Sequence, residues 1–378
     1  MRIEAIDLHH VAMPLLEPWR TACSDETAIE SVIVRLIGEG GVEGWGETAP
    51  HRGPLYSPEW AFGVFCVLRD WLAPLVLGQE VESGRDLQEL LRPVKGNFFA
   101  KAGLDIAWWD AHAKAEGRPL WQLIGGVRRT VEAGADLGVK DTIDELLREI
   151  AAAIEAGFKR VKLKYRPGWD IDMVSAVRSA FPDMVFHIDC NSGYALDDLD
   201  MFRKLDRFGL AMIEQPLGHD DLLDHARLQA EIETPICLDE TITSPARARH
   251  AIDLKACRWI NIKAGRVGGL TNAVAVHELC REAGIGNWIG GMLESALGQA
   301  PSLALATLPN VRYPSDIFPS RRFYAADLAD PELSLSGPGM AEAPLRPGHG
   351  WLPDPHRLAR WTRNTASLTA PAATMAAC

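Results

Sequence analysis

Five short apolar runs in the middle of the chain each end in a charged residue, at nearly equal distances along the sequence. The charged residues are Lys164, Asp189, Glu214, Asp239 and Lys263, and the intervals between them are 25, 25, 25 and 24 residues. A strand, a helix and two loops need about that much chain, so the pattern predicts five successive βα units of a parallel sheet. The five side chains would then form one ring at the carboxyl ends of the strands, where barrel enzymes place their active sites.

The residue types in this ring indicate a metal-assisted reaction next to a carboxylate. Asp189, Glu214 and Asp239 come from neighbouring strands, and three carboxylates favour Mg²⁺ or Mn²⁺ over zinc, which Cys or His would bind. In an eight-stranded barrel the strands ending in Lys164 and Lys263 lie on opposite sides of the mouth. A substrate carboxylate held on the metal would have one amine on each face, which suits removal of the proton from the neighbouring carbon. Solvated strand ends could explain any one of these charges, but hardly all five.

A third lysine belongs to the same predicted site. Lys162 precedes Lys164 by two residues, so both side chains point to the same face of the strand. The positive charge of Lys162, together with the metal, is expected to lower the pKa of Lys164, because an ordinary ammonium is a poor base at neutral pH. We therefore expect Lys164 and Lys263 to be the acid and base. Lys162 would assist electrostatically and contact the substrate carboxylate.

Longer motifs surround the ring. They are Val161–Lys164 with Pro167–Asp170, Ile188–Asn191, Ile213–Leu217, Ile236–Glu240, Asn261–Lys263 with Gly265–Gly269, and Gly290–Ser295. In these segments the chain resembles the enolase superfamily and, within it, the muconate lactonizing branch. The likeness is greatest to o-succinylbenzoate synthases and N-acylamino (N-succinylamino) acid racemases, and it covers residues 1 to 350 approximately.

The resemblance implies an α/β fold, namely a modified TIM barrel, (β/α)7β, with an N-terminal α+β capping domain that the C-terminal segment completes. It also implies Mg²⁺-dependent (or Mn²⁺-dependent) removal of the α proton of a small carboxylate substrate, giving a metal-stabilised enediolate. The activity would be that of an o-succinylbenzoate synthase, an N-acylamino acid racemase, or both. Asn191 and Glu240 would lie beside the metal ligands.

Loops of the cap close over the barrel mouth in proteins of this kind. Trp19, Arg20 and Tyr56 lie in the corresponding segments and are pocket candidates, although aromatic residues on surface loops need have no such role. Met292 and Glu294, in the last of the matching motifs, are candidates on the barrel side.

The chain departs from the expected pattern in the pocket wall. Asp136 stands where such enzymes carry a small polar residue, at the end of the first barrel strand, and Arg166 follows the lysine pair in place of an acid. Two outcomes are open. An unpaired Asp136 would repel an anionic succinyl tail and favour neutral or cationic tails. Alternatively, Asp136 would pair with Arg166 and leave specificity unchanged.

Other functions remain open on the same ring. A dipeptide epimerase or a muconate-type cycloisomerase would use the same metal and lysines. A sugar-acid dehydratase is disfavoured, because Trp288–Gly290 lacks the late histidine that such enzymes place there. A non-catalytic barrel would have little reason to keep the whole ring.

The sequence also suggests how the chain is divided. We expect a capping domain at 1–126, the barrel at 127–322, a segment returning to the cap at 323–361, and a tail without fixed structure at 362–378, where small residues dominate.

Composition excludes several other classes. The net charge of −12 argues against nucleic-acid binding, and no apolar run is long enough to span a membrane. Seven cysteines without a framework spacing indicate reduced thiols and a cytoplasmic location. We expect a homo-oligomer with a small-molecule substrate and no nucleic-acid or membrane partner.

Overall fold

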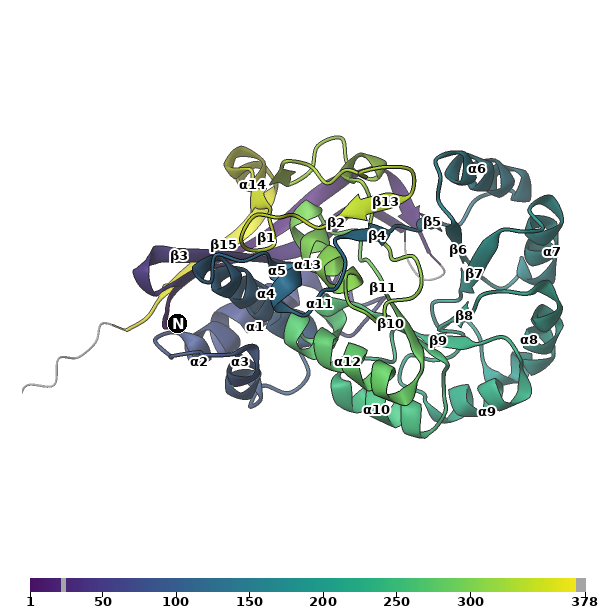
Figure 1. Ribbon diagram of the computed structural model, residues 1–378, viewed down its shortest axis with the longest axis horizontal. Helices are drawn as coiled ribbons and strands as arrows, with labels where there is room; N and C mark the ends of the chain where they lie inside the picture. Colours follow the sequence, from purple (N-terminus) through teal and green to yellow (C-terminus); the bar gives the residue numbers. More distant parts are fainter. Residues whose placement is uncertain (22–24, 372–378) are drawn as a thin grey trace, which may run out of the picture.

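The computed structural model describes residues 1–21 and 25–371, which form an antiparallel cap sheet and a curled parallel sheet surrounded by helices (Figure 1). The cap sheet has the strand order β15-β1-β2-β3, and all its neighbours are antiparallel. Its strands are β1 (Ile3–Arg20), β2 (Asp25–Gly38), β3 (Val42–Thr48) and β15 (Thr362–Thr369). Between β2 and β3 the chain turns through Gly40 and Gly41, whose φ angles of 76° and 77° favour glycine.

One long helix lies between the cap sheet and the barrel. It is α4 (Phe98–Ala115), and it is buried on nearly all sides, which explains why its sequence is apolar all round. Strand β3 crosses it closely, because a Cβ atom at Gly44 would come within 1.9 Å of the Ala107 carbonyl oxygen. The other cap helices are α1 (Ala61–Val67), α2 (Ala73–Val76), α3 (Gly84–Leu91) and α5 (Leu120–Leu123).

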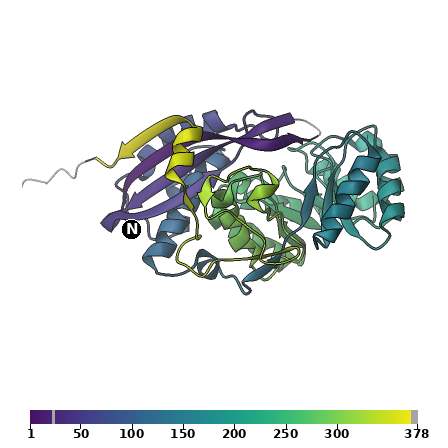
Figure 2. The same ribbon diagram turned by 90° about the horizontal axis from the view of Figure 1, so that it is seen from above.

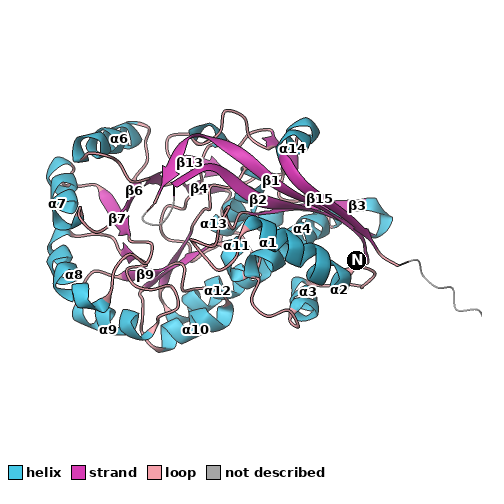
Figure 3. Ribbon diagram, turned by 180° about the vertical axis from the view of Figure 1, so that it is seen from behind, coloured by secondary structure: helices cyan, strands magenta, loops and turns pink. Residues whose placement is uncertain are grey.

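The barrel sheet has seven parallel strands in the order β11-β10-β9-β8-β7-β6-β5, with helices around its outside (Figure 3). The strands are β5 (Ala135–Leu137), β6 (Arg160–Lys164), β7 (Val185–Asp189), β8 (Ile213–Glu214), β9 (Ile236–Leu238), β10 (Trp259–Ile262) and β11 (Gly286–Ile289). The helices are α6 (Ile143–Glu155), α7 (Asp170–Ala180), α8 (Leu199–Leu205), α9 (Leu223–Glu231), α10 (Pro245–Asp253), α11 (Ala264–Val267), α12 (Leu270–Ala283) and α13 (Ala296–Ala306).

An irregular segment closes the barrel in place of an eighth strand. Parallel bridges join Asn287 to Val311 on one side and Ala133 to Ser315 on the other. The Asp316 amide also donates to the Ile289 carbonyl oxygen at 2.8 Å. The predicted fold class, a modified barrel with an α+β cap, is confirmed.

The remaining elements are short. They are the strands β4 (Thr130–Glu132), β12 (Ala329–Asp330), β13 (Met340–Glu342) and β14 (Leu352–Pro353), the helix α14 (Pro355–Trp361), and the helical turns η1 (Glu39–Gly41), η2 (Leu68–Leu72), η3 (Leu196–Asp198), η4 (Asp206–Phe208) and η5 (Ser320–Arg322).

The prediction of an unstructured tail from residue 362 is wrong for the first part of that segment. Residues Thr362–Thr369 form β15, which pairs with β1 from Val11 to Ala5. Burial alternates along β15, and Leu368 packs against the core while its neighbours face water. Because most residues of β15 are small and polar, the alternation of buried and exposed positions is not visible in the sequence. The backbone hydrogen bonds of β15 are made to the open edge of β1. Residues 372–378 lie outside the described part of the chain.

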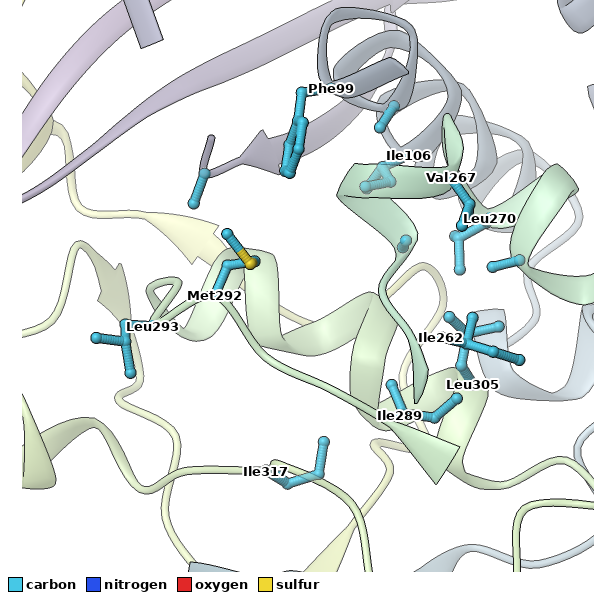
Figure 4. Packing of buried hydrophobic residues seen from close by; sticks show 14 of the residues in the cluster. Phe99, Ile106, Ile262, Val267, Leu270, Ile289, Met292, Leu293, Leu305 and Ile317 are labelled. Carbon is cyan, nitrogen blue, oxygen red and sulfur yellow. The ribbon is translucent and has the colours of Figure 1, made fainter. Parts of the chain in front are cut away.

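Cap and barrel share a packed interface. Figure 4 shows Ile106 of α4 close to Val267 and Leu270 of the barrel helices. The far end of the β1–β2 hairpin reaches the barrel on the other side (Figure 2), where the Arg20 carbonyl oxygen accepts from the Val139 amide at 3.1 Å. This hairpin therefore brings the predicted pocket residue Trp19 to the barrel mouth.

Two further findings concern the chain as a whole. No helix in residues 1–21 and 25–371 has the length and apolar character that crossing a bilayer requires. Five cysteines lie in the described ranges, and all five are free thiols; Cys23 and Cys378 lie outside those ranges.

Candidate active site

The five charged residues of the sequence pattern meet at one end of the parallel sheet. Lys164, Asp189 and Glu214 are the last residues of β6, β7 and β8, while Asp239 and Lys263 directly follow β9 and β10. The register places Lys164 beside Asp189 and Asp189 beside Glu214. Since β6 and β10 are four strands apart in the sheet order, the two lysines approach the mouth from different sides.

Each of the two lysines forms an ion pair with a different carboxylate. The Lys164 ammonium donates to Asp189 Oδ2 at 2.6 Å, and the Lys263 ammonium donates to Asp239 Oδ2 at 3.0 Å. Tyr56, from the cap, joins the second pair, because its hydroxyl donates to Asp239 Oδ2 at 3.1 Å and accepts from Lys263 at 3.2 Å. The cap loop thus completes the polar contacts of the barrel mouth.

Lys162 has two carboxylate partners of its own. Its ammonium lies 2.8 Å from Asp316 Oδ2 and 3.0 Å from Asp136 Oδ2, and all three side chains are buried. Asp316 also accepts from Arg160 at 2.8 Å. These four residues form a neutral layer of two cations and two anions directly below the ring. The charge of Lys162 is therefore largely offset.

This layer changes the expectation for the proton affinity of Lys164. Burial lowers the pKa of Lys164, and Lys162 lowers it further, but Asp189 and Asp136 outweigh both, so the pKa lies above its usual value. The predicted effect of Lys162 has the right sign but is outweighed as the side chains stand. A cation that neutralised the charge of Asp189 would therefore lower the pKa of Lys164.

Both earlier alternatives for Asp136 are wrong. The carboxylate is neither unpaired nor paired with Arg166; it faces the pocket and forms an ion pair with Lys162. The register explains this, because Asp136 of β5 lies directly beside Lys162 of β6. Arg166, beyond the end of β6, stacks instead on Trp169, with its guanidinium carbon 5.6 Å from the ring centroid.

The carboxylates of Asp189, Glu214 and Asp239 are the type of ligand that a hard divalent cation prefers, although their oxygens do not converge on one point. Among the residues that the structure describes, no three His, Cys, Asp or Glu side chains are grouped so as to hold a metal ion. Lysines and Arg266 bind the oxygens of Asp189 and Asp239 instead. Burial and the nearby Asp189 charge raise the pKa of Glu214, which indicates negative charge that the chain's own cations do not fully offset. Three acidic oxygen donors from adjacent strands are the set that Mg²⁺ prefers.

Asn191 and Glu240 contact each other, and the Asn191 backbone amide donates to Asp189 Oδ1 at 3.1 Å. The Asn191 side-chain amide donates to Glu240 Oε1 at 3.0 Å, and the other carboxylate oxygen, Oε2, is buried without a partner in the described part of the chain. A buried carboxylate oxygen without a donor is unfavourable, so a ligand or cation at this point would relieve it.

The pocket at the ring encloses a volume of about 50 Å³. Its lining combines the three lysines with five of the predicted pocket residues, namely Trp19, Tyr56, Asp136, Asn191 and Met292. Three other candidates lie elsewhere. Arg20 faces a neighbouring cavity, Glu240 lines a cavity beyond Tyr56, and Glu294 accepts from the Met292 amide and the Gln299 side chain.

Sequence reasoning missed several side chains at the site. Arg266 binds Asp239 and donates to the Asn261 carbonyl oxygen at 2.6 Å, and the Asn261 side chain donates to Glu214 at 2.6 Å. His51 lines the pocket, and burial together with Lys263 and Lys164 lowers its pKa to about 4, so the imidazole is neutral. Arg266 lies three residues beyond Lys263, on the helix that follows the strand, and this spacing was the available signal. No motif or spacing in the sequence around His51 indicates that this residue belongs to the site.

Comparisons with known proteins agree with this geometry. Residues 3–125 match the model for the mandelate racemase / muconate lactonizing enzyme N-terminal domain, and residues 145–357 match the model for the enolase C-terminal domain-like family. The chain is 43% identical to N-succinylamino acid racemase of Thermus thermophilus over 366 residues, covering 96% of this chain and 99% of the relative. It is 41% identical to o-succinylbenzoate synthase of Geobacillus stearothermophilus over 363 residues, covering 96% of both.

A solved structure of an enolase superfamily member from Listeria innocua superposes with a TM-score of 0.94 at 36% identity, covering 98% of this chain and 99% of that one. Both domain models, the full-length relatives and this superposition agree with the motifs around the ring. The chain belongs to the enolase superfamily, in its mandelate racemase and muconate lactonizing enzyme branch, and is an enzyme similar to o-succinylbenzoate synthases and N-succinylamino acid racemases.

Proposed function

We propose that this enzyme removes the proton from the carbon next to a carboxylate, with N-acylamino acids, N-succinylamino acids among them, as racemisation substrates and with o-succinylbenzoate synthesis as the second activity of the same site. One observation carries the proposal. Lys164 and Lys263 line a single pocket, and they come from strands on different sides of the barrel mouth. Two amines placed in this way can act on opposite faces of one carbon atom.

The two lysines divide the work of racemisation. One lysine, as the neutral amine, takes the α proton from one face, and the other, as the ammonium, gives a proton to the opposite face. In dehydration Lys164 takes the α proton and then gives it to the hydroxyl group whose C–O bond breaks, so that water leaves, while Lys263 faces the negative charge that develops on the substrate carboxylate. We assign Asp189, Glu214 and Asp239 to the binding of Mg²⁺ or Mn²⁺. The bound cation supplies positive charge against the substrate carboxylate.

The cap closes this site. Tyr56 holds Lys263 and Asp239 through its hydroxyl group, and Trp19 forms part of the pocket wall. Exclusion of water around the two lysines strengthens each electrostatic contact inside the pocket. The cap residues therefore complete the wall of the pocket, while the barrel supplies the lysines that transfer protons.

The test follows the α proton itself. Exchange of the α proton of N-succinyl-L-phenylalanine and N-succinyl-D-phenylalanine is measured by NMR in D₂O with Mg²⁺. Lys164→Ala and Lys263→Ala should each reduce exchange of one enantiomer far more than of the other, by about 10²-fold or more, because each removes one acid–base group. EDTA should abolish exchange and Mg²⁺ should restore it.

Lys159→Ala is the matched control, since Lys159 lies just before β6, is 69% exposed and pairs with Glu132. Wild-type exchange of both enantiomers in either single lysine variant of the pocket would contradict the two-base assignment. Full activity after EDTA would contradict the metal assignment. Exchange with dipeptides or turnover of muconate, but none with N-acylamino acids, would replace the proposed substrate class.

A further inference from the structure

A second cavity lies next to the active-site pocket, on the other side of Trp19. It encloses a volume of about 290 Å³, and Trp19 lines both spaces. Its other walls are the end of β1, residues 138–140 after β5, Glu149 of α6, and Arg322 with Phe323 beyond the segment that closes the barrel. Trp19 meets Phe323 edge to face at 5.5 Å between ring centroids. Trp19 therefore belongs to the wall of both cavities.

Arg322 differs from the other cations of this second cavity. Arg20 pairs with Asp141 at 2.9 Å, and Lys140 pairs with Glu149. Among the residues that the structure describes, Arg322 has no ion pair with a carboxylate: its Nη2 donates to the backbone carbonyl oxygen of Asp136, and its Nε is buried without a partner. Burial lowers the pKa of Arg322, and the charges of Asp136, Glu149 and Asp316 offset this only in part.

The contacts of Arg322 tie it to the catalytic pocket. Asp136 accepts from Arg322 through its backbone oxygen and pairs with Lys162 through its side chain at 3.0 Å. The guanidinium therefore contacts Asp136, a member of the charged layer that lies beneath the two catalytic lysines. The carboxylate of Asp136 does not repel an anion strongly here, because Lys162 offsets its charge.

We propose that Arg322 binds the carboxylate at the far end of the substrate's N-acyl tail, as in an N-succinyl group, and that the cavity beyond Trp19 is the subsite for that tail. This inference rests on the proposed function. A guanidinium with a free N–H matches the geometry of a carboxylate. In an extended succinyl tail the far carboxylate lies about 6 Å from the α carbon, from standard bond lengths, so the tail of a substrate held at the lysines extends toward the wall that the two cavities share.

The experiment compares two substrates that differ only in this charge. N-succinyl-L-phenylalanine ends in a carboxylate, and N-succinamoyl-L-phenylalanine ends in a neutral carboxamide of nearly the same shape. The wild-type enzyme should prefer the succinyl compound in kcat/KM for α-proton exchange. Arg322→Met should reduce that preference by about tenfold or more, as loss of a charge-assisted hydrogen bond does, and should leave kcat/KM for the carboxamide nearly unchanged.

Two further variants separate charge from folding. Arg322→Lys should retain part of the preference, because the charge remains. Arg321→Met removes the same charge one residue earlier, from a side chain that is 87% exposed and pairs with Glu332, and should behave as wild type. An unchanged preference in Arg322→Met would overturn the proposal. A second outcome would also overturn it. Arg322→Met could change the ratio of kcat/KM between N-acetylglutamate and N-acetylglutamine while leaving the ratio between the two phenylalanine compounds unchanged. Arg322 would then bind the amino-acid side chain and not the N-acyl tail.

Failure of the proposed function is detected separately. If the wild-type enzyme exchanges neither compound, the function is wrong, and calorimetric titration of the same two ligands with Mg²⁺ present still tests the subsite. Weaker binding of the succinyl compound alone in Arg322→Met supports the subsite. Equal loss of affinity for both ligands, or no loss, overturns it.

Discussion

Glu47 belongs to β3 of the cap, yet its carboxylate binds the barrel. It accepts from the Ser295 hydroxyl and from the Gly298 amide at 3.0 Å, at the start of α13, and from the Ser31 hydroxyl at 3.0 Å within the cap. A carboxylate at a helix N-terminus is stabilised by the free amides there. Burial opposes this and, with Glu294 and Asp327 nearby, raises the pKa of Glu47 to about 7.

This residue predicts a pH dependence of folding stability. In the folded protein the pKa of Glu47 is about 7, above the value of 4.5 expected after unfolding, so its favourable contribution is complete below pH 4.5 and is lost as pH rises through 7. Glu47→Gln removes the proton equilibrium. The stability of wild type relative to this variant should therefore fall between pH 4.5 and pH 8, by up to about 3 kcal/mol.

Urea unfolding of both proteins across this pH range measures the difference. Glu155→Gln, at the exposed end of α6, should follow wild type at every pH. A difference between wild type and Glu47→Gln that stays constant with pH would show that Glu47 keeps an ordinary proton affinity.

At the scale of elements, β15 covers an edge that the cap would otherwise expose. Strand β15 pairs with one edge of β1 over residues Thr362–Thr369. The other edge of β1 pairs with β2. Without β15, the backbone groups of β1 that face it would have only water as partner. The last strand in the sequence is thus joined to the first.

Shortening the chain tests this pairing. A protein that ends at Trp361 should be less stable than one that ends at Pro371, because it loses the whole β1–β15 ladder. We expect a melting temperature lower by several degrees, and faster hydrogen exchange at the amides of β1 that face β15. Equal melting temperatures and equal exchange in the two proteins would contradict a stabilising role for this strand.

At the scale of the molecule, cap and barrel are connected at several separate places. Asp105 of α4 accepts from the Thr271 hydroxyl at 2.6 Å and from its amide at 3.0 Å, at the start of α12. Tyr56 of the cap accepts from Lys263 of the barrel, and the C-terminal segment is tied to the cap because His349 Nε2 donates to the Trp45 carbonyl oxygen at 2.9 Å. Because these contacts are buried and lie on different sides, the two parts are expected to unfold together.

Metal binding should reveal this coupling, if the proposed ligands are right. Mg²⁺ would bind barrel residues only, but a ligand that binds the native state stabilises everything that unfolds with it, by about 2.7 kcal/mol at 100 times the dissociation constant. Scanning calorimetry of the wild-type protein should therefore show one transition that moves to higher temperature with Mg²⁺.

Asp239→Asn should remove the shift, whereas Asp200→Asn, at a position 87% exposed on α8, should keep it. A second transition that does not respond to Mg²⁺ would show that the cap unfolds independently.

The sequence by itself determined the ring and the family. Each βα unit needs a nearly constant length of chain, and parallel strands align their carboxyl ends, so the spacing of Lys164, Asp189, Glu214, Asp239 and Lys263 was enough to place them together. These features depend on residues close to one another in the chain.

Only the tertiary structure decided which charges face one another. Asp316 reaches Lys162 across 154 residues of sequence, and this contact cannot be read from local patterns. The same is true of Asp136 pairing with Lys162, of β15 finding the edge of β1, and of Arg322 remaining without a carboxylate. Ion pairing and burial depend on distances through space, because a charge loses its water only where other elements pack around it.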